Sequence, residues 1–304
     1  MAKTITSEME RINRKNAKHQ KGKEKKYSFA ADAWKRFKRN RTALVGLAII
    51  VLYFIIMITA GIISPYDPNE VNAFDAQMAP CAAHWFGTDS LGRDLFSRCM
   101  YGSRVSLPFG IVCMFTSLIV GGLFGMCAAY FGGKTDNIIM RIMDILQAIP
   151  GIMLAIVVIA SVGTGIPQLI IAMTISYLPN FAKTVRAAFF TVKGNDYIEA
   201  CRSIGAGDLR LMLVHMLPNA LGHIIIFAIQ IVSSSIMAMA AMSYIGLGVN
   251  PPTSEWGALL NAGKDYLRTD PYMVLFPGLM IAIIMLGFNL FADGLRDALD
   301  PRLK

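Results

Sequence analysis

Long apolar stretches separated by short polar segments dominate the chain. The first, residues 43–63, holds no charged residue and is long enough for a helix to cross a hydrocarbon core of about 30 Å. Later stretches have a similar length. We therefore predict an all-α polytopic membrane protein with six transmembrane helices. The predicted spans are residues 43–63, 105–131, 138–162, 168–186, 220–247 and 273–292.

Two longer polar segments interrupt this pattern. Residues 64–103 contain three prolines and no long apolar run, which is typical of an external loop. Residues 193–219 form a polar insert between the fourth and fifth spans. Counting spans from a cytoplasmic N-terminus places the first segment outside the cell and the second in the cytoplasm.

The insert has the pattern of a short helix. Asp196 and Glu199 have the spacing of a capping box, and Gly205 stands where such a helix would end. Pro218 directly precedes the next apolar stretch. The pattern predicts an exposed helix, a turn and a return to the membrane.

The third span carries polar side chains near its inner end. Arg141, Asp144 and Gln147 follow one another at three-residue spacing, so they share a helix face, and Pro150 marks a break. Ionisable residues inside a membrane indicate function by default. Because these lie close to the cytoplasm, we expect packing or an ion pair between Arg141 and Asp144.

The second span carries small residues at strict four-residue intervals. Such a row lets another helix approach closely. It indicates either a moving or subunit-forming interface or static packing within the chain. The row consists of Cys113, Ser117, Gly121, Gly125 and Ala129.

Composition and charge agree with a membrane protein. Hydrophobic residues make up 55% of the 304 residues and charged residues 16%, whereas soluble domains carry about a quarter charged residues. The net charge of +9 raises the possibility of nucleic-acid binding. The basic residues gather outside the apolar stretches instead of alternating with aromatic ones, so we expect no nucleic-acid partner.

The N-terminal segment is strongly basic. Residues 1–41 hold fourteen basic and four acidic residues, which places this end in the cytoplasm, and six spans return the C-terminus to the same side. Trp34 and Phe37 lie among lysines and arginines, as in an interfacial helix that contacts membrane lipid. We therefore divide the chain into a basic tail with an interfacial helix, residues 1–41, and a membrane domain, residues 42–304.

The positions of the cysteines and histidines do not indicate a catalytic or metal site. Cys81 and Cys99 share the predicted external loop, where they would be either a disulfide or two free thiols. The four histidines lie in different regions, so no metal site is expected.

Motifs for catalysis are missing from the sequence. It contains no phosphate-binding loop of the GxxxxGK[ST] type, no nucleophile elbow and no HExxH helix. A carrier that couples transport to ions usually needs carboxylates inside the membrane, and Asp144 is the one candidate in the spans. We expect the chain to be neither an enzyme nor a cofactor-binding protein, and to receive energy from outside through the exposed helix.

The insert resembles the EAA loop of permease subunits of binding-protein-dependent ATP-binding-cassette importers. That pattern reads E-A-A, three residues, G, nine residues, then I-x-L-P. Glu199, Ala200, Gly205, Leu217 and Pro218 match it.

Two positions depart from the pattern, since Cys201 replaces the second alanine and His215 stands where isoleucine is usual. The resemblance extends over nearly the whole chain and is closest to the dipeptide, oligopeptide and nickel branch, in the subunit with a basic amphipathic N-terminus. The segments that carry it are WKRFKRNRTALVGL, SPYDPN, HWFGTDSLGRDLFSRCMYGSRVSL, SYIGLGVNPPTSEWG and DGLRDALDPRL.

This resemblance implies a type I importer permease fold in a bacterial inner membrane and a defined set of partners. A second permease subunit would complete the pathway, two ATPase subunits would bind ATP and Mg²⁺, and an external binding protein would deliver the substrate. The helix in the insert would couple the permease to an ATPase. The residues implied in this coupling are Asp196, Tyr197, Glu199, Ala200, Cys201, Ser203, Gly205, Ala206, Leu217 and Pro218.

Several alternatives remain open at this point. Glu199 would contact the ATPase, cap its own helix, or do both. The cargo implied is a di- or oligopeptide, with nickel or another small solute as the alternative. A stand-alone proton-coupled carrier and a membrane scaffold without transport are the alternatives from other classes.

Overall fold

The computed structural model describes residues 34–299, so most of the predicted basic tail lies outside the described residues. Within that range every regular element is helical, apart from an isolated bridge between Thr88 and Asp94. The helices are α3 (Arg41–Ile63), η1 (Ala73–Asp75), α4 (Leu95–Phe131), α5 (Gly133–Gln147), α6 (Gly151–Val162), α7 (Ile166–Lys193), α8 (Asp196–Ser203), α9 (Asp208–Arg210), η2 (Leu211–Met216), α10 (Leu217–Tyr244), α11 (Trp256–Gly263), η3 (Lys264–Tyr266) and α12 (Tyr272–Leu299).

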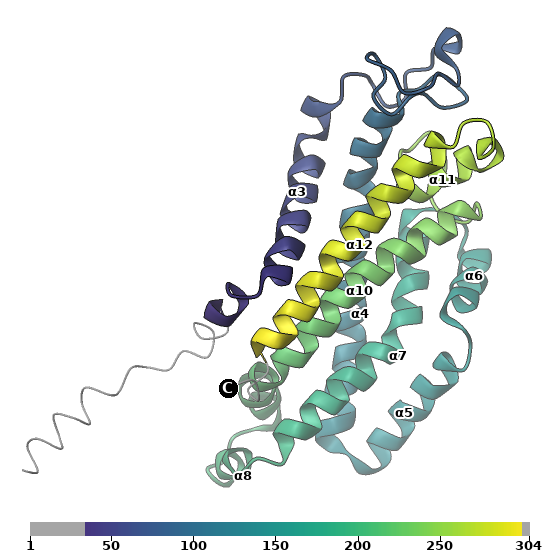
Figure 1. The fold of residues 1–304 in the computed structure, drawn as a ribbon. Helices are drawn as coiled ribbons and strands as arrows, with labels where there is room; N and C mark the ends of the chain where they lie inside the picture. The colour runs from purple at the N-terminus through teal and green to yellow at the C-terminus, as the bar shows by residue number, and fades with distance from the viewer. Residues whose placement is uncertain (1–33, 300–304) are drawn as a thin grey trace, which may run out of the picture.

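The long helices form one bundle with a different polar segment at each end. Figure 1 shows α8 at one end, and the connection between α3 and α4 together with α11 at the other. In the described range, four helices are long and apolar enough to cross a membrane: α3, α4, α12 and the continuous run from α9 through α10.

The predicted third and fourth spans differ from this simple pattern. The third is a pair of helices, α5 and α6, bent by 85° at the break around Pro150, and counting the pair gives at most five apolar spans. The fourth, α7, has the length of a span, but polar residues in its middle lower its hydropathy. By length and hydropathy the described residues thus contain four apolar spans, or five with the bent pair, where the sequence predicted six.

The predicted external loop is also shorter than expected. α4 begins at Leu95, ten residues before the predicted start of the second span, and the Asp94 side chain accepts a hydrogen bond from the Ser97 N–H as its cap. Cys99 therefore lies buried inside a helix while Cys81 is exposed in the loop, and both are free thiols.

Close helix contacts hold the bundle together. A Cβ added at Gly46 of α3 would lie 2.6 Å from the Phe291 nitrogen of α12, so these two backbones touch. Phe37 is buried against the same helix, with its ring 5.5 Å from that of Phe291, and Trp34 stacks on Phe37. The end of the predicted interfacial helix thus packs on protein through Phe37 and leaves Trp34 exposed.

Charged side chains are buried in the loop at residues 64–94. Asp89 accepts a 2.7 Å hydrogen bond from Arg93 Nε, and its carboxylate lies 3.7 Å from Arg98 Nε. His84 Nδ1 lies 2.9 Å from Asp94. Each of these side chains is buried, and each lies within 4 Å of an oppositely charged or ionisable partner.

Candidate functional site

α8 begins one residue earlier than a capping box on Asp196 requires. Its N-cap is Asn195, which makes no side-chain capping hydrogen bond, and Asp196 is already inside the helix. The predicted capping role of Glu199 is therefore wrong. Asp196 and Glu199 lie exposed in the first turn, where negative charge is favourable next to the helix dipole.

The end of α8 is a Schellman motif. The Gly205 N–H donates to the Arg202 carbonyl at 3.0 Å, and the Ala206 N–H donates to the Cys201 carbonyl at 3.1 Å. Gly205 has φ +86°, which glycine adopts without strain, and a Cβ there would meet nothing within 4 Å. The glycine is required for its backbone conformation and not for space.

One face of α8 is buried and the other faces solvent. Ile198 is 3% exposed and joins a core cluster that includes Val192 of α7 and Leu211 and Met216 of η2. The predicted coupling residues are divided between the two faces. Tyr197, Glu199, Ala200 and Ser203 are exposed, whereas Cys201 and Ala206 are half-buried against the cluster, so only their outer parts are open to a partner.

Side chains of α7, α8 and α9 contact the end of α4. Tyr130 Oη donates a 2.5 Å hydrogen bond to Asp208, and Arg202 donates to the same hydroxyl at 3.3 Å, which holds the pKa of Arg202 above its ordinary range. Lys193 Nζ donates to the carbonyls of Ala129 and Tyr130 at 2.8 and 2.7 Å, the last carbonyls of α4. These contacts join the insert to the end of a membrane helix.

The return to the membrane is continuous with the fifth span. The π-helix η2 leads directly into α10, and the Leu217 N–H donates to the Met212 carbonyl, five residues back. Pro218 has no N–H to donate and lies at the start of α10. The fifth span, predicted to begin at residue 220, is therefore part of one helical run from Asp208 to Tyr244.

The row of small residues on α4 faces α7 of the same chain. A Cβ added at Gly121 would lie 2.7 Å from the Leu178 oxygen, and one at Gly125 would lie 2.3 Å from the Ala182 oxygen. Ser117 and Ala129 on the same face are fully buried. In this structure the row brings two backbones of one chain into contact.

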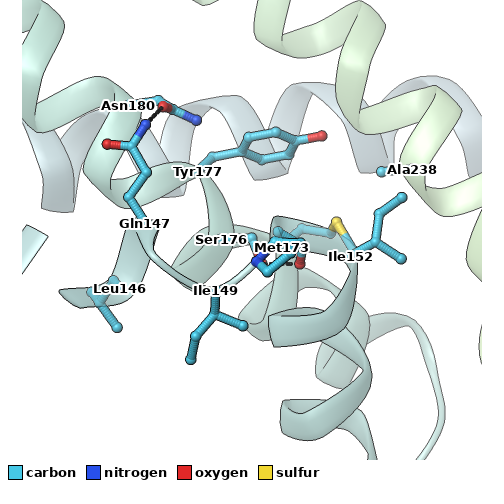
Figure 2. Close-up of a pocket in the computed structure, with 11 residues that line it drawn as sticks. Leu146, Gln147, Ile149, Ile152, Met173, Ser176, Tyr177, Asn180 and Ala238 are labelled. Atoms are coloured by element: carbon cyan, nitrogen blue, oxygen red, sulfur yellow. Dashed lines mark hydrogen bonds between the residues drawn. The ribbon is translucent and has the colours of Figure 1, made fainter. Parts of the chain in front are cut away.

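A pocket of about 330 Å³ opens beside the bend between α5 and α6. Figure 2 shows Gln147 and Ile149 from the bend on one side, and Ser176, Tyr177 and Asn180 of α7 on the other. Ser176 Oγ donates to the Gly151 carbonyl at 3.1 Å, which joins α7 to the start of α6.

Asp144 pairs with a residue that the sequence did not indicate. Its carboxylate lies 2.7 Å from Lys183 Nζ of α7, so the expected pair between Arg141 and Asp144 is not the one formed. Farther along, Arg186 donates to Asp136 through two nitrogens at 2.6 and 2.5 Å. α5 is therefore held to α7 by two ion pairs.

Comparison with known proteins adds the family. The model of the binding-protein-dependent transport system inner membrane component matches residues 121–304, more than half of the chain. The chain belongs to this family. It is a multi-pass inner membrane component of an ATP-binding-cassette importer, and a transport permease by class.

Relatives of this inner membrane component support the predicted branch. The model of the N-terminal transmembrane domain of oligopeptide transport permease C matches residues 28–80. The chain is 43% identical over 272 residues to the glutathione transport system permease protein GsiD of Escherichia coli O6:K15:H31, covering 89% of this chain and 90% of the relative. GsiD of Shigella dysenteriae serotype 1 is 42% identical over the same length.

Solved structures show the same fold. A chain of the inward-facing MetNI methionine ABC transporter superposes with a TM-score of 0.55 at 20% identity, covering 68% of this inner membrane component and 96% of that chain. A second crystal form gives a TM-score of 0.54.

Sequence reasoning missed two polar networks of this inner membrane component. The Tyr130, Asp208 and Arg202 contacts join residues far apart in the chain, and no local spacing indicates them. The network around Asn180 had a readable signal, because Ser176, Asn180 and Lys183 follow one another at helical spacing along α7.

Proposed function

We propose that this chain forms, with a second homologous permease subunit, the membrane pathway of an ATP-driven importer, and that α8 docks on an ATPase subunit. The observation that supports this most is the division of α8 into two faces. Ile198 anchors one face in the chain's own core, while Glu199 on the other face is exposed and caps nothing. An exposed, anchored helix of this kind is suited to bind a partner.

Apolar side chains next to α8 strengthen the docking proposal. Ile204 is 85% exposed and Leu209 is 70% exposed, and both lie in the polar insert at residues 193–219. Exposed apolar residues that adjoin a charged helix are typical of a protein contact site. In this proposal ATP and Mg²⁺ bind to the separate ATPase subunits, and both termini of the permease lie in the cytoplasm.

The contacts of Tyr130 and Lys193 provide a route from α8 into the membrane. They join the insert to the last turn of α4, and the ion pairs of α7 with α5 continue the connection. When ATP closes the ATPase pair, α8 moves and the linked helices move with it, which changes the side on which the pathway opens.

We propose short peptides as the cargo, delivered by an external binding protein. The support is the identity with permeases named for glutathione transport, since glutathione is itself a tripeptide, and the match to an oligopeptide permease domain.

The test is ATP-driven uptake by the complete complex in proteoliposomes. Glu199→Arg reverses the exposed charge, so we expect loss of ATPase association and a fall in uptake of about tenfold or more. Lys134→Glu reverses an exposed charge at the start of α5, outside the insert, and is the matched control. Uptake driven by a proton gradient without the ATPase, or normal coupling in Glu199→Arg, would contradict the proposal.

A further inference from the structure

A relay of hydrogen bonds joins α5 to α7 beside the bend. Lys183 Nζ lies 2.7 Å from Asp144 and also donates to Gln147 Oε1. Gln147 Nε2 in turn donates to Asn180 Oδ1 at 3.2 Å, the bond drawn as a dashed line in Figure 2.

The chemistry of lysine fixes the direction of this relay. An ammonium group can only donate, so Gln147 must turn its oxygen towards Lys183 and its nitrogen towards Asn180. Asn180 must then accept with its oxygen, which leaves its NH₂ group over. Among the described residues this NH₂ has no hydrogen-bond partner, and Figure 2 shows it on the side of Tyr177.

The surroundings of the relay indicate a ligand that brings acceptors. The oxygens of Gln147 and Asn180 already accept, and Asp144 is paired with Lys183. The Asn180 NH₂ group is left as a donor without an acceptor. The pocket has a volume of about 330 Å³, at the small end of the range for ligand sites, about 300–1,000 Å³. It suits one end of a short peptide.

The position of the relay along α7 favours a water-filled space over lipid. Asn180 lies in the inner half of the predicted fourth span, residues 168–186, and Gln147 opposite it is exposed. Polar side chains at membrane depth face protein or a water-filled cavity because lipid cannot satisfy them. In secondary transporters, broken helices next to such groups form the substrate sites.

We propose that this pocket is a subsite of the transport pathway, in which the Asn180 and Gln147 amide groups hold the C-terminal carboxylate of the peptide cargo. The inference rests on the proposed function, because it concerns the passage of a peptide through this subunit. It assigns cargo recognition to the permease in addition to the external binding protein.

The experiment uses the complete complex in proteoliposomes with saturating, cargo-loaded binding protein. Uptake of a tripeptide with a free C-terminal carboxylate is compared with uptake of its C-terminal amide. Asn180→Asp has nearly the same shape but replaces the free NH₂ by a negative charge. We expect uptake of the free acid to fall about tenfold and that of the amide by no more than about twofold.

A second variant separates the relay from the added charge. Gln147→Glu still accepts from Lys183 but cannot donate to Asn180, which must then turn its NH₂ group towards the new carboxylate. We expect the same preference for the amide, at about threefold. Asn137→Asp makes the Asn-to-Asp change at an exposed position of α5 outside the pocket, and should leave the ratio of the two peptides unchanged.

The outcomes distinguish the two proposals. Normal uptake with an unchanged ratio in Asn180→Asp and Gln147→Glu would overturn the subsite alone. Equal loss for both peptides, together with loss of the second permease on co-purification, would show that the polar face is a subunit interface and would also overturn it. Absence of ATP-driven uptake of either peptide by the wild-type complex would overturn the proposed function and the subsite with it.

Discussion

The loop at residues 64–94 and the insert at residues 193–219 both connect membrane helices, but they differ in how far charged side chains are exposed to solvent. In the loop, Asp89 and Arg93 are buried and paired with each other. In the insert, Glu199 is exposed and has no capping role. Charged side chains that are buried and paired within one segment stabilise that segment. A charged side chain that is exposed on an anchored helix is available to bind a partner.

Asp89→Ala should have the largest effect on stability, because it removes the shared partner of two buried guanidinium groups. We expect a loss of about 3–5 kcal/mol in the free energy of unfolding, measured by thermal unfolding of the purified protein in detergent. Asp67→Ala removes an exposed carboxylate from the same loop, and a change of about 0.5 kcal/mol is expected. Equal effects of the two variants would show that the buried ion pairs of Asp89 do not stabilise the loop.

Gly205→Ala should destabilise the end of α8 by about 1 kcal/mol, because alanine is strained at φ +86°. Gly207→Ala is the matched control, since Gly207 has φ −69° and alanine adopts that conformation freely. Hydrogen exchange of the α8 amides measures both. Faster exchange in Gly207→Ala than in Gly205→Ala would show that the Schellman motif does not hold the helix.

Tyr130→Phe removes the hydroxyl that bonds Asp208 and Arg202, with an expected loss of about 1 kcal/mol in the local stability of the insert. Hydrogen exchange over residues 196–210 should accelerate about fivefold. Tyr197→Phe removes an exposed hydroxyl from α8 itself and should leave exchange unchanged. If the two variants behave alike, Tyr130 does not tie the insert to α4.

Glu199→Ala should have the smallest effect, within about 0.5 kcal/mol of wild-type stability. A carboxylate that capped the helix would cost about 1 kcal/mol on removal. Thermal unfolding decides between these values. A clear loss of stability would restore the capping role and weaken the case for Glu199 as a docking residue.

Local sequence patterns predicted the elements better than their junctions. The exposed helix and the terminating role of Gly205 follow from residue type and spacing, and both are confirmed. The N-cap was misplaced by one residue because the backbone path after α7, and not the side chain of Asp196, decides where α8 begins. Spacing alone carries no information about that path.

Contacts between residues far apart in the chain could not be predicted from local sequence patterns. The break at Pro150 was predicted, but its 85° angle depends on the packing of α6 against α7. The predicted partner of Asp144 was wrong for a related reason. Helical spacing identifies Arg141, three residues away, but Lys183 comes close to Asp144 only when α5 and α7 pack together.

Because the cysteines differ in exposure, the protein carries a native thiol that can be chemically labelled at each end of the bundle. Cys81 is an exposed thiol in the loop, Cys201 of α8 is half-buried, and Cys99 and Cys113 are buried. The loop and α8 lie at opposite ends of the bundle (Figure 1). If both termini lie in the cytoplasm, as proposed, a charged maleimide that cannot cross a bilayer modifies Cys81 in intact cells and reaches Cys201 only once the membrane is opened. With Cys127 replaced by serine, the native thiols alone would report the sidedness of both polar segments.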